Sequence, residues 1–154
     1  MLVESILLKI FATPDENPQE ISDKFLKILP FDLAIEHLSL NRKTVTGFNQ
    51  QRMVIFQLKL TKKKHTRVFL EYFKNKLSNE VKVQLLETLE KRVDDDCKLY
   101  IRLNKVTFLY HDQYELTSDG LCLHITIHVR TFPKRKENAL QEIRNYLTSD
   151  IPIK

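Results

Sequence analysis

The chain has 154 residues, of which 42% are hydrophobic and 29% are charged, and its formal net charge is +5. This length and composition are typical of a folded globular chain with a core of its own, so we expect one domain over residues 1–154. They exclude a disordered chain, a membrane-spanning protein and a disulfide-stapled fold, because no linker-like or long apolar run is present and the only cysteines, Cys97 and Cys122, lack CxxC spacing.

The N-terminal part predicts a strand followed by a helix. Residues Val3 to Ala12 are rich in Ile, Leu and Phe, as in a buried strand. Asn17 is placed to cap a helix whose first residue is Pro18, a position where the missing N–H of proline costs nothing. Apolar residues then repeat at helical spacing until Pro30 ends the helix: Ile21, Phe25, Ile28 and Leu29.

Two strands and two helices are predicted next. Residues 33–40 and 53–60 have the apolar content of strands, and the connection between them contains Gly47, which can take a positive φ. Apolar stripes at helical spacing follow over residues 68–77 and 81–93. Ser78 is placed to cap the second of these helices.

The C-terminal part predicts two more strands and a last helix. Residues 94–96, three consecutive aspartates, end the helical pattern and lead into a strand over residues 99–110. The apolar phase of this strand shifts at Val106, which predicts a bulge or a strand covered on both faces. Residues 121–129 alternate cleanly between apolar and polar, as in a strand with one buried face. After Pro133 a last helix is predicted, whose inward side chains are Ala139, Leu140, Ile143 and Leu147.

This order of elements predicts an α+β fold. Strands joined directly favour a largely antiparallel or mixed sheet of about five strands, with the helices packed mainly on one face. The apolar stripes place these helical side chains against the sheet: Phe25, Phe69, Phe73, Leu85 and Ile143.

Positive charge is concentrated in one part of the chain. Residues 41–76 contain ten Lys or Arg residues and a single acid, Glu71. A local excess of this size attracts a polyanion within a Debye length, roughly 8 to 10 Å at ordinary salt, so RNA is the partner we expect. The candidate phosphate contacts in this block are Arg42, Lys43, Arg52, Lys59, Lys62, Lys63, Lys64 and Arg67.

Two basic clusters stand at predicted strand-to-helix junctions. Residues 62–67 follow one strand, and Lys134, Arg135 and Lys136 follow another, where helix N-terminal N–H groups also favour phosphate. If both junctions share one edge of the sheet, they line a groove with six or more cations. The alternative is that residues 62–64 are only a solvated charged loop.

A sheet face is the second candidate surface. Tyr100, Arg102 and Asn104 alternate on their strand, as do His124, His128 and Arg130 on theirs. Such a face can stack unpaired bases and contact phosphates, with Arg102 and Lys105 as secondary cations. The alternative reading is that Tyr100 packs under a helix and the polar residues are the wet side of the sheet.

Metal, catalytic and secretory readings find no support. His124 and His128 lie four residues apart on a strand, about 13 Å, which is too far to share one ion. The aspartates at 94–96 fit a turn better than a magnesium site, and no phosphate-cradling or catalytic motif occurs. We therefore expect no cofactor, no metal and no nuclease activity. Since the N-terminus lacks the basic start of a secretory signal, we expect a cytoplasmic protein with no membrane partner.

The chain also resembles a known family. Residues 99–105 (Leu-Tyr-Ile-Arg-Leu-Asn-Lys), 125–130 (Ile-Thr-Ile-His-Val-Arg) and 133–136 (Pro-Lys-Arg-Lys), with the helix end at 28–30 (Ile-Leu-Pro), resemble the archaeal small RNA-binding proteins known as predicted exosome subunits. The resemblance covers nearly the whole chain. It implies an α+β fold similar to that of the ribosomal protein that binds 5S RNA, and a role in RNA binding or processing.

The sequence thus predicts a non-catalytic RNA-binding domain in which charge and shape outweigh base readout. The alternative is a protein-interaction module that docks on a larger RNA-processing complex through a free sheet edge, with the lysines keeping that edge apart from other chains. Formation of a homodimer is left open.

Overall fold

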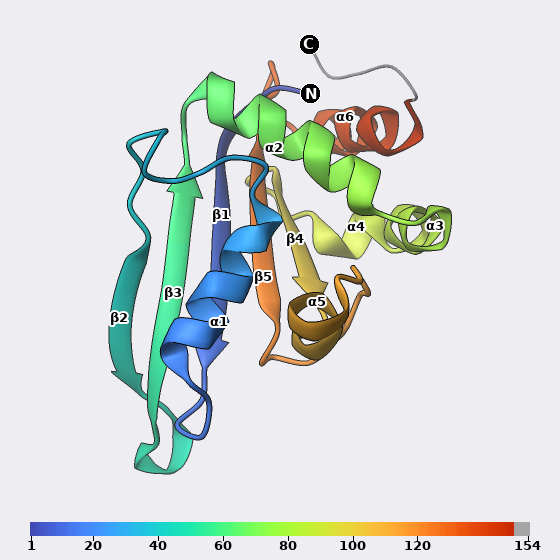
Figure 1. The fold of residues 1–154 in the computed structure, drawn as a ribbon. Coiled ribbons are helices and arrows are strands. Elements are labelled where there is room, and N and C mark those ends of the chain that lie inside the picture. The colour runs from blue at the N-terminus through green and yellow to red at the C-terminus, as the bar shows by residue number, and fades with distance from the viewer. Residues whose placement is uncertain (150–154) are drawn as a thin grey trace.

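Five strands form one antiparallel sheet in the order β2-β3-β1-β5-β4 in the computed structural model, which describes residues 1–149 (Figure 1). The strands are β1 (Val3–Ala12), β2 (Asn41–Thr46), β3 (Arg52–Leu60), β4 (Lys98–Leu103) and β5 (Leu123–Val129). The helices are α1 (Pro18–Phe25), α2 (Lys63–Lys76), α3 (Asn79–Glu87), α4 (Leu89–Arg92), α5 (Lys105–His111) and α6 (Lys136–Thr148), with 3-10 turns at Leu26–Ile28 and Phe48–Gln50.

The helices lie on one side of the sheet (Figure 1). Alternate residues of β1 point to that side and are buried, and the same alternation occurs in β5. Antiparallel register places Ile6 beside both Leu60 and Ile127, so the three central strands contribute to one apolar layer. The predicted α+β class, with helices on one face of a five-stranded sheet, is confirmed.

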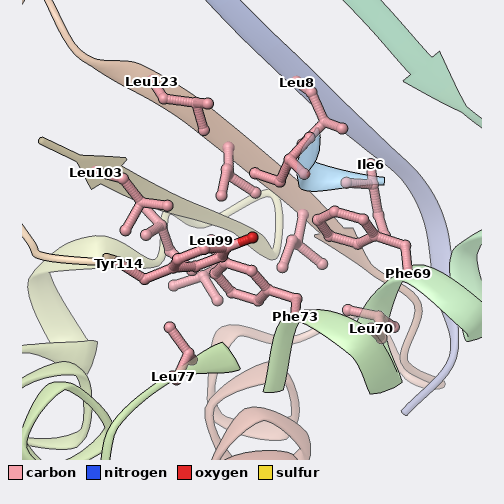
Figure 2. Packing of buried hydrophobic residues seen from close by; sticks show 14 of the residues in the cluster. Ile6, Leu8, Phe69, Leu70, Phe73, Leu77, Leu99, Leu103, Tyr114 and Leu123 are labelled. Carbon is pink, nitrogen blue, oxygen red and sulfur yellow. The ribbon is translucent and has the colours of Figure 1, made fainter. Parts of the chain in front are cut away.

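Two aromatic side chains from α2 pack in the core. Phe69 and Phe73 stack with ring centroids 5.6 Å apart, and the Phe73 ring lies 5.9 Å from that of Tyr114 (Figure 2). All five helical residues predicted to face the sheet are buried in this cluster. The apolar periodicity of the sequence was therefore sufficient to identify the core side of the helices.

Tyr114 carries a hydroxyl that the fold does not use. The side chain is 5% exposed, its hydroxyl has no hydrogen-bond partner among the described residues, and burial raises the pKa of the phenol well above its usual range. We expect Tyr114→Phe to leave the free energy of unfolding unchanged or raise it by up to about 1 kcal/mol, because it removes an unsatisfied polar group.

Urea denaturation measures this change, and Tyr146→Phe is the matched control. The Tyr146 hydroxyl donates to the Leu70 carbonyl oxygen at 2.5 Å, so removing it should cost about 1 kcal/mol. Equal losses for both variants would contradict the expectation for Tyr114.

The strand predicted over residues 33–40 was wrong. Asp32 accepts hydrogen bonds from the backbone N–H groups of Ala34 (2.9 Å) and Ile35 (3.1 Å), which start a series of turns instead. The strand begins only at Asn41. Leucines of the turn segment pack partly against the core, which explains the apolar pattern without a strand: Leu33, Leu38 and Leu40.

The β2–β3 connection also differs from the prediction. Gly47 has a φ of −89°, whereas Asn49 (φ 61°) and Gln50 (φ 58°) take the left-handed conformation. Asparagine tolerates this region because of its short polar side chain. The positive φ is therefore present, but it does not fall on the glycine.

The strand predicted over residues 99–110 ends early. Asn104 caps α5 by accepting a hydrogen bond from the Thr107 N–H at 3.0 Å, so the chain turns from β4 into a helix at this residue. This change of element, rather than a bulge, shifts the apolar phase. Similarly, the helix predicted over residues 81–93 is interrupted at Thr88, which separates α3 from α4.

The predicted helix starts are confirmed. Asn17 accepts from the N–H groups of Gln19 and Glu20, and Ser78 accepts from that of Val81. None of the helices in residues 1–149 has both the length and the apolar character needed to cross a bilayer.

Candidate nucleic-acid interface

The two basic strand-to-helix junctions lie at the same end of the sheet. β3 leads into α2 and β5 leads into α6, and both strands pair antiparallel with β1. The pairing of Ile6 with Leu60 and Ile127 therefore brings both junctions to the N-terminal end of β1, one on each side of it. The cations at this end form what we call the junction cluster: Lys59, Lys62, Lys63, Lys64, Arg67, Lys134, Arg135 and Lys136.

The junction before α2 carries several exposed cations that have no ion pair within residues 1–149. Lys62, Lys63, Lys64 and Arg67 are exposed, and no acidic residue occupies the first turn of α2. Lys64 pairs with Glu36 at 3.1 Å, and the hydrogen bond from Lys64 holds the pKa of this carboxyl below its usual value. Its three neighbours have no carboxylate partner within residues 1–149. Anions are favoured beside such a helix N-terminus.

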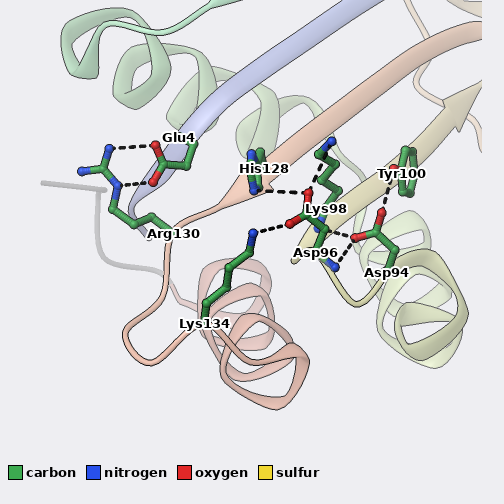
Figure 3. A network of polar contacts seen from close by, with 8 residues as sticks. All are labelled: Glu4, Asp94, Asp96, Lys98, Tyr100, His128, Arg130 and Lys134. Carbon is green, nitrogen blue, oxygen red and sulfur yellow. Dashed lines mark hydrogen bonds and ion pairs between the residues drawn. The ribbon is translucent and has the colours of Figure 1, made fainter.

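The junction before α6 is partly neutralised. Lys134 pairs with Asp96, and Arg130 forms a two-pronged ion pair with Glu4 at 2.8 and 3.1 Å (Figure 3). The hydrogen bond from Lys134 lowers the pKa of Asp96, and that from Arg130 lowers the pKa of Glu4. The next residues, Arg135 and Lys136, have no acidic partner in the described part of the chain. Six of the eight junction-cluster cations thus have no carboxylate partner within residues 1–149.

Two hollows connect the junctions. One, of about 300 Å³, is lined by Lys59, His128 and Lys134 and by Glu4, whose charge Arg130 pairs, and the other, of about 80 Å³, by Lys63 and Arg67. Thr61 and Arg130 line both, so the hollows adjoin. A larger hollow of about 520 Å³ between α3 and the segment after α5 contains Glu80 and Glu115, and its acidic lining does not suit phosphate.

The structure separates some predicted residues from the junction cluster. Arg52 pairs with Thr46 at the far end of β3, eight residues or about 26 Å from Leu60. Arg42 lies on the helix-bearing side of β2, over the Phe56 ring at 5.7 Å. Arg52, one of the candidate phosphate contacts, is therefore remote from the junction cluster. Lys43 pairs in register with Ile55 on the opposite side of the sheet from the helices.

Of the two secondary candidates, one is inside the protein. Lys105 is 9% exposed and its ammonium lies 2.5 Å from the Glu16 carboxylate, so the fold already uses this charge. Arg102 is exposed on β4 and donates a hydrogen bond to the Ser118 carbonyl oxygen at 3.3 Å.

The face of the sheet opposite the helices contains residues that sequence reasoning did not identify. Lys9, Phe11 and Lys98 lie on it, together with Tyr100 and Arg102 from the prediction. The available signal was the alternation within β1, where every second residue belongs to this face. Tyr100 is 44% exposed, so the expectation that it packs under a helix was wrong.

The aspartates at 94–96 form a turn, as predicted. Asp94 accepts from the backbone N–H groups of Asp96 and Lys98 and from the Tyr100 hydroxyl, all at 2.8 to 2.9 Å (Figure 3). Lys134 neutralises Asp96. Within residues 1–149, no group of three or more His, Cys, Asp or Glu side chains is placed to hold a metal ion.

Comparisons with known proteins identify the fold and the family of this chain. RNA-binding protein PAB1135 of Pyrococcus abyssi is 22% identical over 146 residues, which are 95% of this chain and 94% of that protein. Protein AF2318 from Archaeoglobus fulgidus has the same fold, with a TM-score of 0.82 at 21% identity over 94% of this chain and 99% of that one. Mth689 from Methanothermobacter thermautotrophicus gives 0.77 at 20% identity over 96% and 99%. A family model described as RNA binding matches residues 5–130, most of the chain, and this protein therefore belongs to that RNA-binding family.

Proposed function

We propose that this protein binds RNA without cleaving it, and that the junction cluster holds the phosphates. The observation that carries the proposal is the meeting of two basic strand-to-helix junctions at one end of the sheet, with six cations that lack a carboxylate partner within residues 1–149. Membership of an RNA-binding family supports RNA as the polyanion.

Binding of this kind is mainly electrostatic. Each cation that neutralises a phosphate of a single strand releases condensed counterions and adds about −0.7 to the slope of log affinity against log salt. Six contacts give a slope of about −4. Phosphate contacts position the RNA without reading its sequence, so different RNA sequences are bound with similar affinity.

The test is a triple variant, Lys62→Gln/Lys63→Gln/Arg67→Gln, measured by fluorescence anisotropy with labelled RNA across a salt series. Loss of three contacts should make the slope shallower by about 2 and weaken binding roughly 100-fold at 0.1 M salt. RNAs of unrelated sequence should weaken equally. Thermal stability should barely change, since exposed charges contribute little to it.

The control variant removes the same charge elsewhere. Lys27, Lys82 and Lys91 lie outside the junction cluster, on the 3-10 turn after α1 and on α3 and α4, and have no ion pair in the described residues. Their replacement by glutamine should leave most of the affinity and the slope intact. If the junction variant folds and still binds with the wild-type affinity and slope, residues 62–64 are a solvated loop and this proposal fails.

A protein-interaction module is the second candidate. Five of the six residues of β2 are exposed, and β2 is an edge strand that pairs only with β3 in the described sheet. An edge of this kind can accept a strand from a partner. The resemblance to predicted exosome subunits makes an RNA-processing complex the partner to test, by co-purification with and without ribonuclease treatment. An association that survives ribonuclease treatment but is abolished by Lys43→Pro would favour this candidate.

A further inference from the structure

The sheet face opposite the helices is basic. In register, its outward positions on the five strands include no Asp or Glu apart from Glu4, at the irregular pairing near the start of β1. Two further carboxylates reach its rim from the turn before β4, where Asp94 accepts a hydrogen bond from the Tyr100 hydroxyl and Asp96 lies 3.5 Å from the Lys98 ammonium. Lys and Arg occur on every strand except β5, which contributes His124 and His128. We call this surface the open face, and its cations are Lys9, Lys43, Lys59, Lys98 and Arg102. A protein face on which cations outnumber carboxylates is complementary to a polyanion.

A row of aromatic and cationic side chains crosses the centre of the open face. Antiparallel register places Arg102 beside His124, and His124 beside Lys9. The Phe11 ring meets the His124 ring edge to face, with centroids 6.0 Å apart, and the Lys9 ammonium lies 5.6 Å from the centre of the Phe11 ring. Neighbouring strands are roughly 4.8 Å apart, so rings and cations alternate across the face at this spacing.

Tyr100 provides the most accessible ring. It stands beside Thr126 and is 44% exposed. Its hydroxyl donates to Asp94 at 2.8 Å, which fixes one end of the ring on the surface (Figure 3). His124 is also held, because its Nε2 lies 3.0 Å from the Gly120 carbonyl oxygen. Burial lowers the pKa of His124, which favours the uncharged imidazole at neutral pH.

We propose that the open face binds unpaired nucleotides of single-stranded RNA, whose bases stack on Tyr100 and on the pair formed by His124 and Phe11. Lys9 and Arg102 hold the adjacent phosphates. The proposal rests on the proposed function and adds the class of RNA. Lys59 and His128 belong both to the open face and to the hollow at the end of the sheet. An RNA chain that leaves the open face therefore continues into the junction cluster.

Single-stranded RNA fits this face better than a second copy of the chain. Two open faces brought together would place five cations against five cations, and the carboxylates at the rim, Glu4 and Asp96, are already paired with Arg130 and Lys134. Double-stranded RNA presents its bases stacked inside the helix, and these cannot reach the rings.

The experiment compares Tyr100→Leu with wild type on a ten-nucleotide oligo(U) and on an RNA duplex of equal charge. Loss of the ring should weaken binding of oligo(U) about tenfold and leave duplex binding and the salt slope unchanged, since stacking does not release counterions. Tyr100→Phe keeps the ring and should retain the wild-type affinity. Tyr110→Leu is the matched control, because Tyr110 is similarly exposed, at 49%, but lies on α5.

A second readout uses the absence of tryptophan from the chain. The variant Tyr100→Trp should show fluorescence quenching when oligo(U) is added, as expected for a base stacked on the indole. The proposal is overturned if Tyr100→Leu binds oligo(U) with the wild-type affinity and Tyr100→Trp shows no quenching. If the junction-cluster salt slope persists in that case, phosphate binding stands and only the open-face site falls.

Two other outcomes also overturn the open-face site. Wild-type protein that binds no RNA at all would remove the proposed function and this inference together. Sedimentation that shows a dimer dissociated by Tyr100→Leu, with RNA affinity unchanged, would assign the face to contact between copies of the chain.

Discussion

Replacing Phe73 by alanine is expected to lower the free energy of unfolding by about 3 to 5 kcal/mol, measured by urea denaturation. The side chain is 1% exposed and contacts two other rings, those of Phe69 and Tyr114. Its removal leaves a cavity between α2 and the sheet that rigid neighbours from β1 and β4 cannot fill (Figure 2). The loss therefore includes both the transfer of the ring to water and the empty space.

Val68, on the exposed side of the same helix, is the control. It is 41% exposed, so Val68→Ala should change the free energy of unfolding by less than about 0.5 kcal/mol. A loss below about 1 kcal/mol for Phe73→Ala would contradict the packing of α2 on the sheet.

The elements that the sequence predicted well have local causes. The strand Val3–Ala12 and the helix starts at Asn17 and Ser78 depend on side chains within a few residues of the backbone groups that they satisfy. The strand wrongly predicted at 33–40 and the strand predicted too long at 99–110 failed for an equally local reason. Asp32 and Asn104 are capping residues whose effect on the backbone outweighed an apolar pattern that also suits a strand.

The candidate site was predictable only in part. The cations of each junction are close together in sequence. The two ion pairs at the second junction, however, join residues that are far apart in the chain: Glu4 with Arg130 and Asp96 with Lys134. No periodicity indicates such pairs. The open face was missed on β1 because its polar and aromatic positions, Lys9 and Phe11, lie within a run that is apolar on average.

Lys105 illustrates the same limit, and its removal gives the other large expected effect on stability. Lys105→Met should destabilise the fold by about 2 kcal/mol, because it leaves the Glu16 carboxylate without its cation. A fully buried pair would cost more, but Glu16 is one quarter exposed and also accepts hydrogen bonds from the Thr13 N–H and hydroxyl, both at 2.9 Å. The RNA affinity should stay within twofold of wild type, and the salt slope should be unchanged.

Lys62→Met is the matched substitution, because it removes the same charge from an exposed position. It should leave the free energy of unfolding within about 0.5 kcal/mol of wild type while making the salt slope shallower by about 0.7. The opposite pattern, in which Lys105→Met reduces the slope and Lys62→Met destabilises the fold, would return Lys105 to the RNA contacts and remove Lys62 from them.

The effect of Lys105→Met should depend on pH in a direction that the Glu16 carboxyl determines. Burial alone would raise the pKa of Glu16, but hydrogen bonds from Lys105 and Thr13 outweigh burial and hold it below the usual value. A carboxyl whose pKa is lowered by folding stabilises the fold above its unfolded pKa, about 4.3, and loses that contribution as the pH falls through the folded pKa. The difference in unfolding free energy between wild type and Lys105→Met should therefore be constant from pH 6 to 8 and shrink below about pH 4, as Glu16 becomes neutral in both proteins. A difference that persists at pH 3 would mean that Lys105 stabilises the fold through packing of its aliphatic stem rather than through its charge.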